Sequence, residues 1–451
     1  MQIDEKIFKK YDIRGVYPQE INRQAAYSIS RAFTDFLKDF YGLQKPKIVL
    51  GYDIRKSSGE LKEAAIKGLL ESGAEVINIG LCSTPLNYFG NWFLKADGSL
   101  MITASHNSKE YNGIKFSLKA VSAPVEVGAE EKIKQRAMRG EFKDGYGDLF
   151  KKNLLSDYIS FLNKEAEAQD FSSFKIAVDC GNGMVGREFE TLAEVLNLNY
   201  QGLFMEPDGD FPNHEPNPLN EEARIPLKNL MQQKDFDLGV MFDGDGDRIV
   251  VFDSSGQAVR TDFIIGLFAQ YSVLEKNNFK IPCDSRISRG VKEEIKKIGG
   301  EILPVRVGYP YVRKRMREEK SLFGAELSGH FFWQDFSYSE SPLLSLIRLL
   351  KILKQKNQPL EELIKPFQKY FSTEEINFQV QDKELTLKKV EKEYSNGEIS
   401  LLDGVTVNFE DWWFNLRPSG TEPFIRLKVE AKSKQLLEEK VSELTNIIKG
   451  A

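Results

Sequence analysis

Three aspartates at alternate positions are the most distinctive chemical feature of the chain. The segment FDGDGDR, residues 242–248, places Asp243, Asp245 and Asp247 around two glycines and ends in Arg248. Such a concentration of negative charge is costly without a cation. Hard divalent ions such as Mg²⁺ take carboxylate oxygens as ligands, usually together with a phosphate. The segment therefore predicts a divalent-metal site, with a simple acidic turn as the alternative.

An EF-hand calcium loop also places aspartates at alternate positions, so it is the obvious competing interpretation. Its sixth position requires glycine and its twelfth requires glutamate. This chain has Arg248 and Ser254 at those positions. The two mismatches exclude an EF-hand.

A strand-like run ends in polar groups within residues 101–110, MITASHNSKE. The apolar part leads to Thr103, and Ser105, His106 and Asn107 follow, which are residue types that a buried strand would not choose. Because Ser and Asn are common in turns, one interpretation is a polar turn after a strand. The other interpretation is that Ser105 carries chemistry, and the remaining motifs decide between the two.

The segment RPSGTEP, residues 417–423, has the composition of a phosphate-binding loop. Arg417, Ser419 and Thr421 supply guanidinium and hydroxyl donors around Gly420, whose backbone can approach a ligand closely. The same residue types also form ordinary turns. The chain contains no Walker A and no G-x-G-x-x-G pattern, so a nucleotide-binding loop is not supported.

The segment GAELSGH, residues 324–330, places Glu326, Ser328 and His330 at alternate positions. In an extended segment all three would point the same way, which suits a ligand that carries hydroxyl groups. A structural histidine is the alternative, but two of the three histidines of the chain stand in such clusters. Two isolated cations complete the candidates, each with a surface charge as its alternative: Arg14 in YDIRG and Lys115 in NGIKF.

The elements that would position these groups follow a repeated pattern of strand, loop and helix. In each of three segments a β-branched run ends in an aspartate, and a helical period follows. The first segment continues as a β-α-β-α-β alternation, which implies a parallel sheet with right-handed crossovers. In such sheets ligands lie beyond the carboxyl ends of the strands, where the polar clusters fall. The three aspartates are Asp53, Asp179 and Asp284.

This pattern predicts an α/β protein with three similar domains of mixed, mostly parallel sheets and a smaller C-terminal α+β domain. The 451 residues also exceed what one hydrophobic core usually supports. We expect the domains to surround a central cleft. The predicted domains are 1–152 with the Ser105 loop, 153–253 with the aspartate loop, 254–367 with the GAELSGH loop, and 368–451 with the RPSGTEP loop.

Composition excludes several classes of function. A net charge of −5 gives no overall attraction for nucleic acid. No apolar run approaches the ~20 residues of a membrane span, and the N-terminus has no apolar signal segment, so a cytoplasmic protein is expected. The spacing of Cys82, Cys180 and Cys283 argues against disulfides and zinc and predicts core residues. The basic run from Arg313 to Arg317 is typical of a solvated helix face.

In this order, YDIRG, TASHN, DGDGDR, GAELSGH and RPSGTEP resemble the α-D-phosphohexomutase superfamily, and most closely its phosphomannomutase/phosphoglucomutase branch. The resemblance covers the whole chain, including PDGDFPNHEPNP at 207–218 and GYDIRKSS at 51–58. It implies that a phosphorylated Ser105 donates its phosphoryl group to a hexose 1- or 6-phosphate. It further implies a hexose 1,6-bisphosphate intermediate and Mg²⁺ held by a phosphate oxygen of that serine and by Asp243, Asp245 and Asp247.

The resemblance also implies roles for the other candidates. Proton transfer would fall to Arg14, Lys115 and His330, and the phosphoserine environment to His106 and Arg248. Sugar hydroxyls would contact Glu326 and Ser328. The non-reacting phosphate would bind to Arg417, Ser419, Gly420 and Thr421. Two departures from the family pattern and one further cation complete the substrate-binding candidates: Arg286 in place of a common Lys, Tyr309 in place of a common His, and Arg426.

Other departures concern Ser108, where the family usually has Pro, and residues 335–344, which lack the usual acidic D-D-G. These changes leave open whether mannose, glucose or glucosamine phosphate is preferred. The alternatives are therefore a phosphoglucosamine mutase, a Ser105-dependent sugar phosphatase and a non-catalytic sugar-phosphate binder. A serine acyl hydrolase is not supported because no G-x-S-x-G elbow is present. A monomer or a homodimer is expected.

Overall fold

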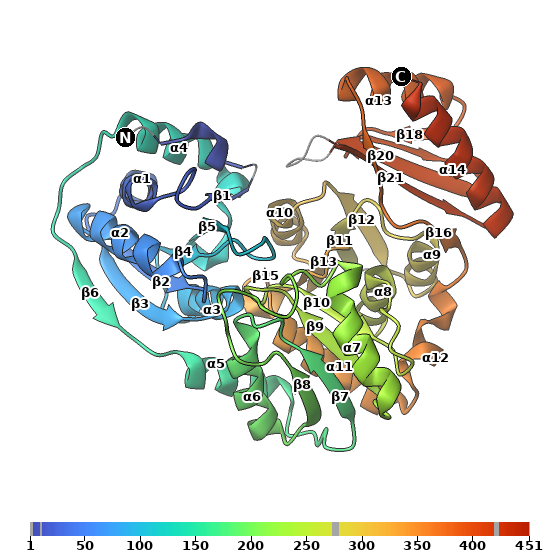
Figure 1. The fold of residues 1–451 in the computed structure, drawn as a ribbon, viewed down its shortest axis with the longest axis horizontal. Helices are drawn as coiled ribbons and strands as arrows, with labels where there is room; N and C mark the ends of the chain where they lie inside the picture. Colours follow the sequence, from blue (N-terminus) through green and yellow to red (C-terminus); the bar gives the residue numbers. More distant parts are fainter. Residues whose placement is uncertain (1–2, 10, 273–278, 419–423, 451) are drawn as a thin grey trace.

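The computed structural model describes residues 3–9, 11–272, 279–418 and 424–450. Within them the chain forms four units in sequence order, each built around its own β-sheet. Figure 1 draws the first unit in blue, the second in green and the C-terminal unit in red. The predicted organisation, with three α/β domains followed by an α+β domain, is confirmed.

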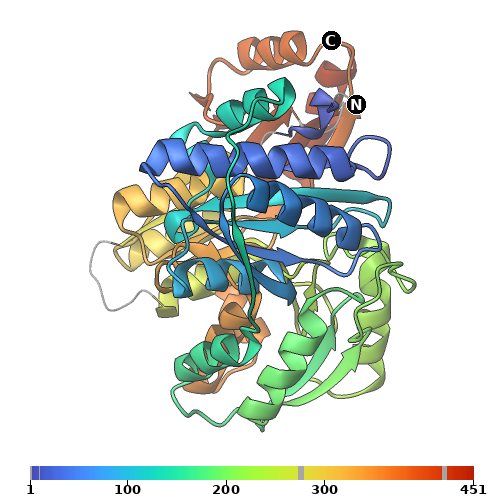
Figure 2. The ribbon, with the colours of Figure 1, turned by 90° about the vertical axis from the view of Figure 1, so that its left-hand side faces the viewer.

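The first sheet is mixed, with the order β1-β5-β4-β2-β3-β6, and β5 runs antiparallel to β1 and β4. Alternation along β2 places Ile48 and Leu50 in one hydrophobic cluster with α1 and α2, whereas Val49 belongs to a second cluster with α3. The sheet is therefore covered by helices on both faces, as Figure 2 shows. The elements are β1 (Ile13–Val16), α1 (Arg23–Tyr41), β2 (Lys47–Tyr52), α2 (Ser58–Glu71), β3 (Glu75–Leu81), α3 (Thr84–Phe93), β4 (Gly98–Ile102), β5 (Tyr111–Leu118), α4 (Glu130–Arg139) and β6 (Asp148–Lys151).

The second and third sheets repeat a parallel core with antiparallel strands at one side. Their orders are β10-β9-β7-β8 and β12-β11-β13-β14-β15. The second unit contains α5 (Leu155–Glu165), β7 (Lys175–Asp179), α6 (Val185–Leu196), β8 (Asn199–Leu203), α7 (Glu221–Gln233), β9 (Leu238–Phe242) and β10 (Ile249–Phe252). The third contains α8 (Thr261–Ser272), β11 (Lys280–Asp284), α9 (Arg289–Lys297), β12 (Glu301–Val305), α10 (Tyr309–Glu319), β13 (Phe323–Ala325), β14 (Phe331–Trp333), β15 (Ser339–Glu340), α11 (Pro342–Lys356) and α12 (Leu360–Ile364).

The C-terminal sheet is antiparallel, with the order β16-β21-β20-β19-β18, and β17 also pairs with β21. Its elements are β16 (Phe371–Ser372), β17 (Ile376–Gln379), α13 (Lys383–Glu393), β18 (Glu398–Ser400), β19 (Val405–Asn408), β20 (Trp412–Pro418), β21 (Phe424–Ala431) and α14 (Lys434–Lys449). Short 3-10 helices lie at Glu5–Ile7, Lys119–Val121, Pro124–Val127, Gln334–Phe336 and Lys365–Phe367.

The hydrophobic cores differ between the units. One continuous cluster of buried side chains runs from α3 of the first unit through the second and third units. The C-terminal unit has a separate cluster, from Phe378 to Ile448. Polar contacts join this unit to the third unit. For example, the backbone N–H of Arg289 donates to Glu430 Oε1 at 2.8 Å. The C-terminal unit therefore has its own core and meets the rest of the molecule through hydrogen bonds and ion pairs.

One expectation about a surface is wrong. The basic run on α10 does not form a uniformly solvated face, because Arg313 is fully buried. Its guanidinium is paired with Glu340, and it lies over the rings of Tyr88 and Tyr309. Local charge density misled the interpretation, since Tyr88 and Glu340 come from distant parts of the chain. Lys314, on the neighbouring position of the helix, is exposed as expected.

The three cysteines are free and buried, as the sequence predicts. Among the helices of the described ranges, none combines the length and apolar character required to cross a bilayer.

Candidate active site

Three loops from three sheets meet at one place. Each loop follows the carboxyl end of a strand: the Ser105 loop follows β4, residues 243–248 follow β9, and residues 326–330 follow β13. Hydrogen bonds between the loops connect Ser105 with Asp243 and Asp247 with His330. The arrangement agrees with the general rule that ligands bind beyond the carboxyl ends of parallel strands.

Ser105 stands in an unusual backbone conformation. Its φ is +52°, in the left-handed region that side-chain-bearing residues rarely adopt, and the residue is only 2% exposed. Its N–H donates to Thr103 Oγ1 at 2.9 Å, and its Oγ donates to Asp243 Oδ2 at 2.9 Å. His106 Nδ1 lies 3.2 Å from the same Oγ. Strain of this kind is concentrated at functional sites, which favours a chemical role for Ser105 over an ordinary turn.

Arg55 holds the Ser105 loop in place, although no sequence pattern marked it as a site residue. Its guanidinium, fully buried, donates to the carbonyl oxygens of Ser105 at 2.7 Å, Asn107 at 2.6 Å and Ser108 at 2.6 Å. Asp53 anchors it at 3.1 Å. Because backbone carbonyls can only accept, an arginine with several donors suits this position. The sequence feature that could have indicated Arg55 is its position, two residues after Asp53, the aspartate at the end of a strand.

The three aspartates form a compact cluster of buried oxygens. One oxygen from each of Asp243, Asp245 and Asp247 lies within 4.8 Å of the other two. Burial raises the pKa of Asp243 well above its ordinary value, and the charges of Asp247 and Asp245 raise it further. Asp243 Oδ1 also accepts the backbone N–H groups of Asp247 at 3.0 Å and Arg248 at 3.1 Å.

Lys115 contributes a cation to this cluster. Its Nζ lies 2.6 Å from Asp245 Oδ2 and 2.5 Å from Asp247 Oδ2. Burial acts to lower the pKa of Lys115, but the two carboxylates outweigh it and hold the pKa well above the ordinary value. Thr84 donates its hydroxyl to Asp245 Oδ2 at 2.5 Å.

The donor set fits a hard divalent cation. All three aspartates offer carboxylate oxygens, the ligand type that Mg²⁺ prefers. Asp245 Oδ1 is buried and has no hydrogen-bond partner among the described residues. A buried carboxylate oxygen without a donor is costly, so a cation near this atom would satisfy it. Ser105 Oγ, 2.9 Å from Asp243, lies where a phosphate attached to it would approach the same ion.

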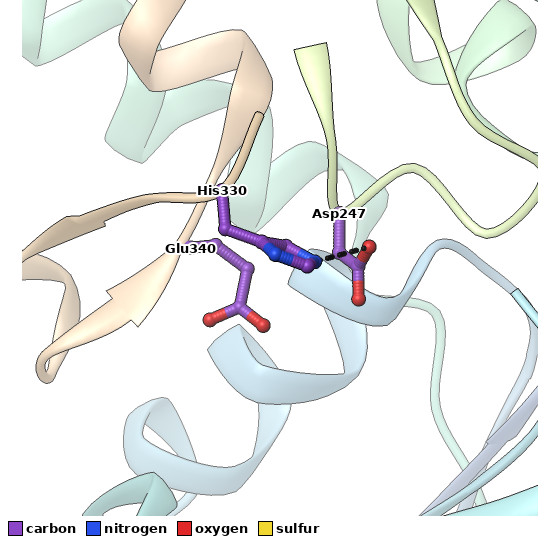
Figure 3. A group of neighbouring side chains, drawn as sticks. All are labelled: Asp247, His330 and Glu340. Carbon is purple, nitrogen blue, oxygen red and sulfur yellow. Dashed lines mark hydrogen bonds and ion pairs between the residues drawn. The ribbon is translucent and has the colours of Figure 1, made fainter. Parts of the chain in front are cut away.

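His330, in the GAELSGH loop, contacts one of the three aspartates, Asp247, as Figure 3 shows. Its Nε2 lies 3.1 Å from Asp247 Oδ1, and its Nδ1 lies 3.1 Å from Glu326 Oε2 and 2.8 Å from Ser328 Oγ. Burial acts to lower the pKa of His330, but the charge of Asp247 outweighs it and raises the pKa to about 9. Glu340, also drawn in Figure 3, is paired with Arg313 and so serves a different contact.

The remaining cations of the motif set lie around Ser105. Arg14 Nη1 donates to Asn107 Oδ1 at 2.5 Å, which joins the YDIRG segment to the serine loop. Arg248 Nε lies 3.8 Å from Asp243 Oδ2. Burial and the charges of Arg248 and Arg14 hold the pKa of His106 well below its ordinary value. Five candidates from the sequence therefore stand around the aspartates: Ser105, His106, Lys115, Arg248 and His330.

Tyr309 lies at the contact between the first and third units. Its hydroxyl donates to the Tyr11 carbonyl at 3.3 Å, and the two rings meet edge to face. The Tyr11 hydroxyl in turn donates to the Val307 carbonyl at 2.7 Å. Gly308, which lies between Val307 and Tyr309 in the sequence, donates its N–H to Glu326 Oε1 at 2.6 Å. The segment 307–309 therefore connects the YDIRG segment, through Tyr11, with the GAELSGH loop, through Glu326.

A second group of candidates converges on Glu375. Arg417 Nη2 lies 2.9 Å from Glu375 Oε1, and Arg426 Nη1 lies 3.5 Å from Glu375 Oε2. Arg286 donates to Glu375 Oε1 as well, and to Asp284 Oδ1 at 2.7 Å. No sequence motif indicated Glu375. The other residues expected in the phosphate cradle lie outside the described residues: Ser419, Gly420 and Thr421.

Comparison with known proteins places the whole chain. Four family models match in order: the phosphoglucomutase/phosphomannomutase alpha/beta/alpha domains I, II and III at residues 5–144, 156–256 and 260–370, and the C-terminal domain at 375–447. A phosphomannomutase of Methanocaldococcus jannaschii is 37% identical, covering 99% of this chain and 98% of its own. A phosphomannomutase of Vibrio cholerae is 35% identical, covering 98% of each chain.

A solved structure supports the same assignment. A phosphoglucomutase/phosphomannomutase family protein of Burkholderia thailandensis has a TM-score of 0.89 and 28% identity, covering 99% of this chain and 98% of its own. The motif order, the four domains and these relatives agree over the full length. The chain belongs to the phosphoglucomutase/phosphomannomutase family.

Proposed function

We propose that the protein interconverts the 1-phosphates and 6-phosphates of mannose, of glucose or of both, with Ser105 as the phosphoryl carrier. The observation that carries the proposal is the Ser105 hydroxyl, which lies 2.9 Å from Asp243 in a strained, left-handed backbone beside the aspartate cluster. Relatives named phosphomannomutase and phosphohexose mutases support the same reaction class.

The proposed transfer exchanges one P–O bond for another. A free hydroxyl oxygen of the bound hexose phosphate attacks the phosphorus of the phosphorylated Ser105 and gives its proton to a nearby base. The bond from phosphorus to Oγ breaks, and Oγ takes up a proton to become the serine hydroxyl. The product of this step is a hexose 1,6-bisphosphate. After the sugar reorients, Ser105 Oγ loses its proton and attacks the other phosphoryl group. The bond from that phosphorus to the sugar oxygen breaks and the sugar oxygen takes up a proton, so serine phosphorylation is restored at the end of each cycle.

Residues of this chain would position and neutralise the reacting groups. Asp243, Asp245 and Asp247, together with a phosphate oxygen of the phosphorylated Ser105, would hold Mg²⁺, which would neutralise the charge that develops during transfer. Arg55 fixes the serine loop through its carbonyls. The phosphoserine would lie beside His106 and Arg248, and proton transfer would be assisted by Arg14, Lys115 and His330.

The sugar and its second phosphate would contact the third and fourth units. Glu326 and Ser328 stand beside His330 and would bind sugar hydroxyls, with Tyr309 and its partner Tyr11 nearby. The non-reacting phosphate would bind to the guanidinium groups of Arg417, Arg426 and Arg286, together with Ser419, Gly420 and Thr421. Guanidinium groups suit this role because their planar donors match phosphate oxygens.

A substrate panel tests the proposal. Mannose, glucose and glucosamine 1-phosphates are assayed with Mg²⁺ and a trace of hexose 1,6-bisphosphate, and the 6-phosphate products are measured. We expect turnover of the mannose ester, the glucose ester or both, and its loss in Ser105→Ala. Exclusive turnover of the glucosamine ester would show a phosphoglucosamine mutase, and release of free phosphate faster than isomer formation would show a phosphatase.

Mass spectrometry of the intact protein provides an independent test. We expect a fraction of the purified protein to carry one additional phosphate, located on Ser105 by peptide mapping. Phosphate on another residue would contradict the mechanism even if the protein turned over hexose phosphates.

The three free, buried cysteines fit a reducing, cytosolic compartment, which we propose as the site of action.

A further inference from the structure

Glu375 occupies the centre of a cluster of arginines. It lies in the three-residue link 373–375 between β16 and β17, where the chain enters the C-terminal sheet. Its carboxylate contacts Arg286 of the third unit and Arg417 and Arg426 of the C-terminal unit. One side chain of the link therefore joins guanidinium groups from two domains.

The arginines require an anion at this position. Arg417 and Arg426 are direct cross-strand partners in the β20–β21 pair, and like charges opposite one another destabilise a sheet. Arg286 and Arg417 are also largely buried, at 5% and 7% exposed. Asp284 contacts Arg286. Glu375 is the anion that all three guanidinium groups share within the described residues.

The same cluster has the chemistry of a phosphate site. Carboxylate and phosphate oxygens bind guanidinium groups in the same two-pronged manner. Burial acts to raise the pKa of Glu375, but the charges of Arg286 and Arg417 outweigh it and lower the pKa to about 2. Glu375 is therefore ionised at neutral pH, and a phosphate dianion placed on the same donors would be repelled by it.

We propose that Glu375 is the resident anion of this cluster and that the non-reacting phosphate of the hexose displaces it when the substrate binds. The inference rests on the proposed function, which places that phosphate at Arg417. Glu375 is then a positioning residue: it keeps the three guanidinium groups together without substrate, and it competes with the phosphate. The competition weakens binding, which favours release of the bisphosphate for reorientation.

Phosphate binding to the full-length protein tests the competition. Inorganic phosphate is titrated by calorimetry into the wild type, Glu375→Gln and the matched control Glu374→Gln, whose exposed side chain lies on the adjacent residue of the link. We expect Glu375→Gln to bind phosphate about tenfold more tightly, because one charged competitor is removed. The control should match the wild type. Equal or weaker binding in Glu375→Gln would overturn the inference.

Two further variants test whether the change in phosphate binding depends on the charge of residue 375 and on Arg417. Glu375→Asp keeps the charge and should retain weak, wild-type-like phosphate binding, which separates the effect of charge from any loss of folding. Arg417→Lys, combined with Glu375→Gln, should abolish the gain in affinity. Phosphate binding that is independent of Arg417 would overturn both the inference and the proposed phosphate subsite. Arg417-dependent binding without a gain in Glu375→Gln would overturn the inference alone.

Steady-state kinetics provide a readout that a purely structural role would not produce. With the hexose 1-phosphate as substrate, Glu375→Gln should lower both KM and kcat, because substrate and bisphosphate are both held more tightly. A residue that merely braced the domain would raise KM when replaced. A raised KM in a folded Glu375→Gln protein would therefore contradict the competition.

Discussion

The first and third units use the same short pattern, an aspartate at the end of a strand and an arginine two residues later, for different purposes. In both, the backbone N–H of the arginine donates to Oδ1 of the aspartate at 3.1 Å. The guanidinium Nε of the same arginine also donates to that carboxylate. Arg55 then donates its remaining N–H groups to backbone carbonyls of the Ser105 loop. Arg286 instead reaches the side chain of Glu375.

The difference lies in the partner, and it separates a fixed support from an exchangeable one. The backbone carbonyls of the Ser105 loop cannot leave Arg55 without unfolding that loop. A carboxylate in the short link between β16 and β17, which contacts arginines of two units, can be replaced by another anion with the same geometry. The second unit shows a third variant: Asp179 accepts the Gly181 N–H at 2.8 Å and lies 3.2 Å from His214 Nε2.

The largest effect is expected from Arg55→Lys. The lysine ammonium would keep the charge opposite Asp53 but lose the fork of donors that holds three carbonyls of the Ser105 loop. Unpaired buried carbonyls are costly, so we expect the free energy of unfolding to fall by about 4 kcal/mol. Urea unfolding measures this loss, and phosphoryl transfer should fall roughly a hundredfold because the loop loses its geometry. A change below about 1 kcal/mol would show that the loop does not depend on Arg55.

The buried carboxylate of Glu188 provides a test of stability against pH. Glu188 accepts hydrogen bonds from Ser83 N–H at 2.9 Å and Ser83 Oγ–H at 2.7 Å, and burial raises its pKa to about 7. As pH rises, the folded protein therefore keeps a proton that the unfolded chain, with a carboxyl pKa of 4.5, has already released. This contribution to stability is present at low pH and is lost as pH rises through 7.

Glu188→Gln isolates that contribution. The amide stays neutral at every pH, so the variant should lack the loss of stability that the wild type shows between pH 5 and 8, on the order of 2 kcal/mol. The difference between the two unfolding free energies, measured by urea titration at a series of pH values, gives the effect directly. A parallel pH dependence in both proteins would exclude Glu188 as its source.

The strain at Ser105 can be measured by comparing two substitutions that both remove the hydroxyl. Ser105→Gly frees the backbone for φ +52°, whereas Ser105→Ala keeps the side-chain carbon that disfavours it. Both variants should lose phosphoryl transfer. We expect the glycine variant to be about 1 kcal/mol more stable than the alanine variant, measured by thermal or urea unfolding. Equal stability would mean that the loop carries no backbone strain at this residue.

The sequence predicts the strands and helices of the repeats because each depends on local periodicity. It also predicts the motif loops, since Ser105, the three aspartates and His330 each follow a strand and have residue types unsuited to a core. Arg55, Glu375 and Arg313 were missed or misjudged for a different reason. Their partners are carbonyls and charges that only tertiary folding brings near, and no local pattern records them.

The sequence pattern also fails to predict two elements of the C-terminal unit. The strand β20 contains a run of six buried residues, and it begins with three consecutive aromatic side chains, so its first half lacks the alternation of apolar and polar side chains that marks a half-exposed strand. The helix α13 follows Asp382, whose side chain caps it by accepting the N–H groups of Glu384 and Leu385. Its highly charged sequence predicts only a charged stretch. The strand β20 is not predicted because both of its faces are buried. The helix α13 is not predicted because its sequence is strongly polar.

The smallest effect is expected from Arg286→Lys, the direct counterpart of the substitution at Arg55. Lysine keeps one charge near Asp284 and Glu375, and both partners are carboxylates that a single ammonium group can satisfy. Because the substitution leaves neither carboxylate without a cation, we expect the free energy of unfolding to change by less than about 1 kcal/mol. KM for the hexose 1-phosphate should rise because the phosphate loses one guanidinium fork. Urea unfolding and steady-state kinetics of the two lysine variants, measured side by side, decide the matter. If Arg286→Lys destabilised the protein as much as Arg55→Lys, the cluster at Glu375 would be a fixed support like the serine loop, and its carboxylate could not be the partner that gives way to phosphate.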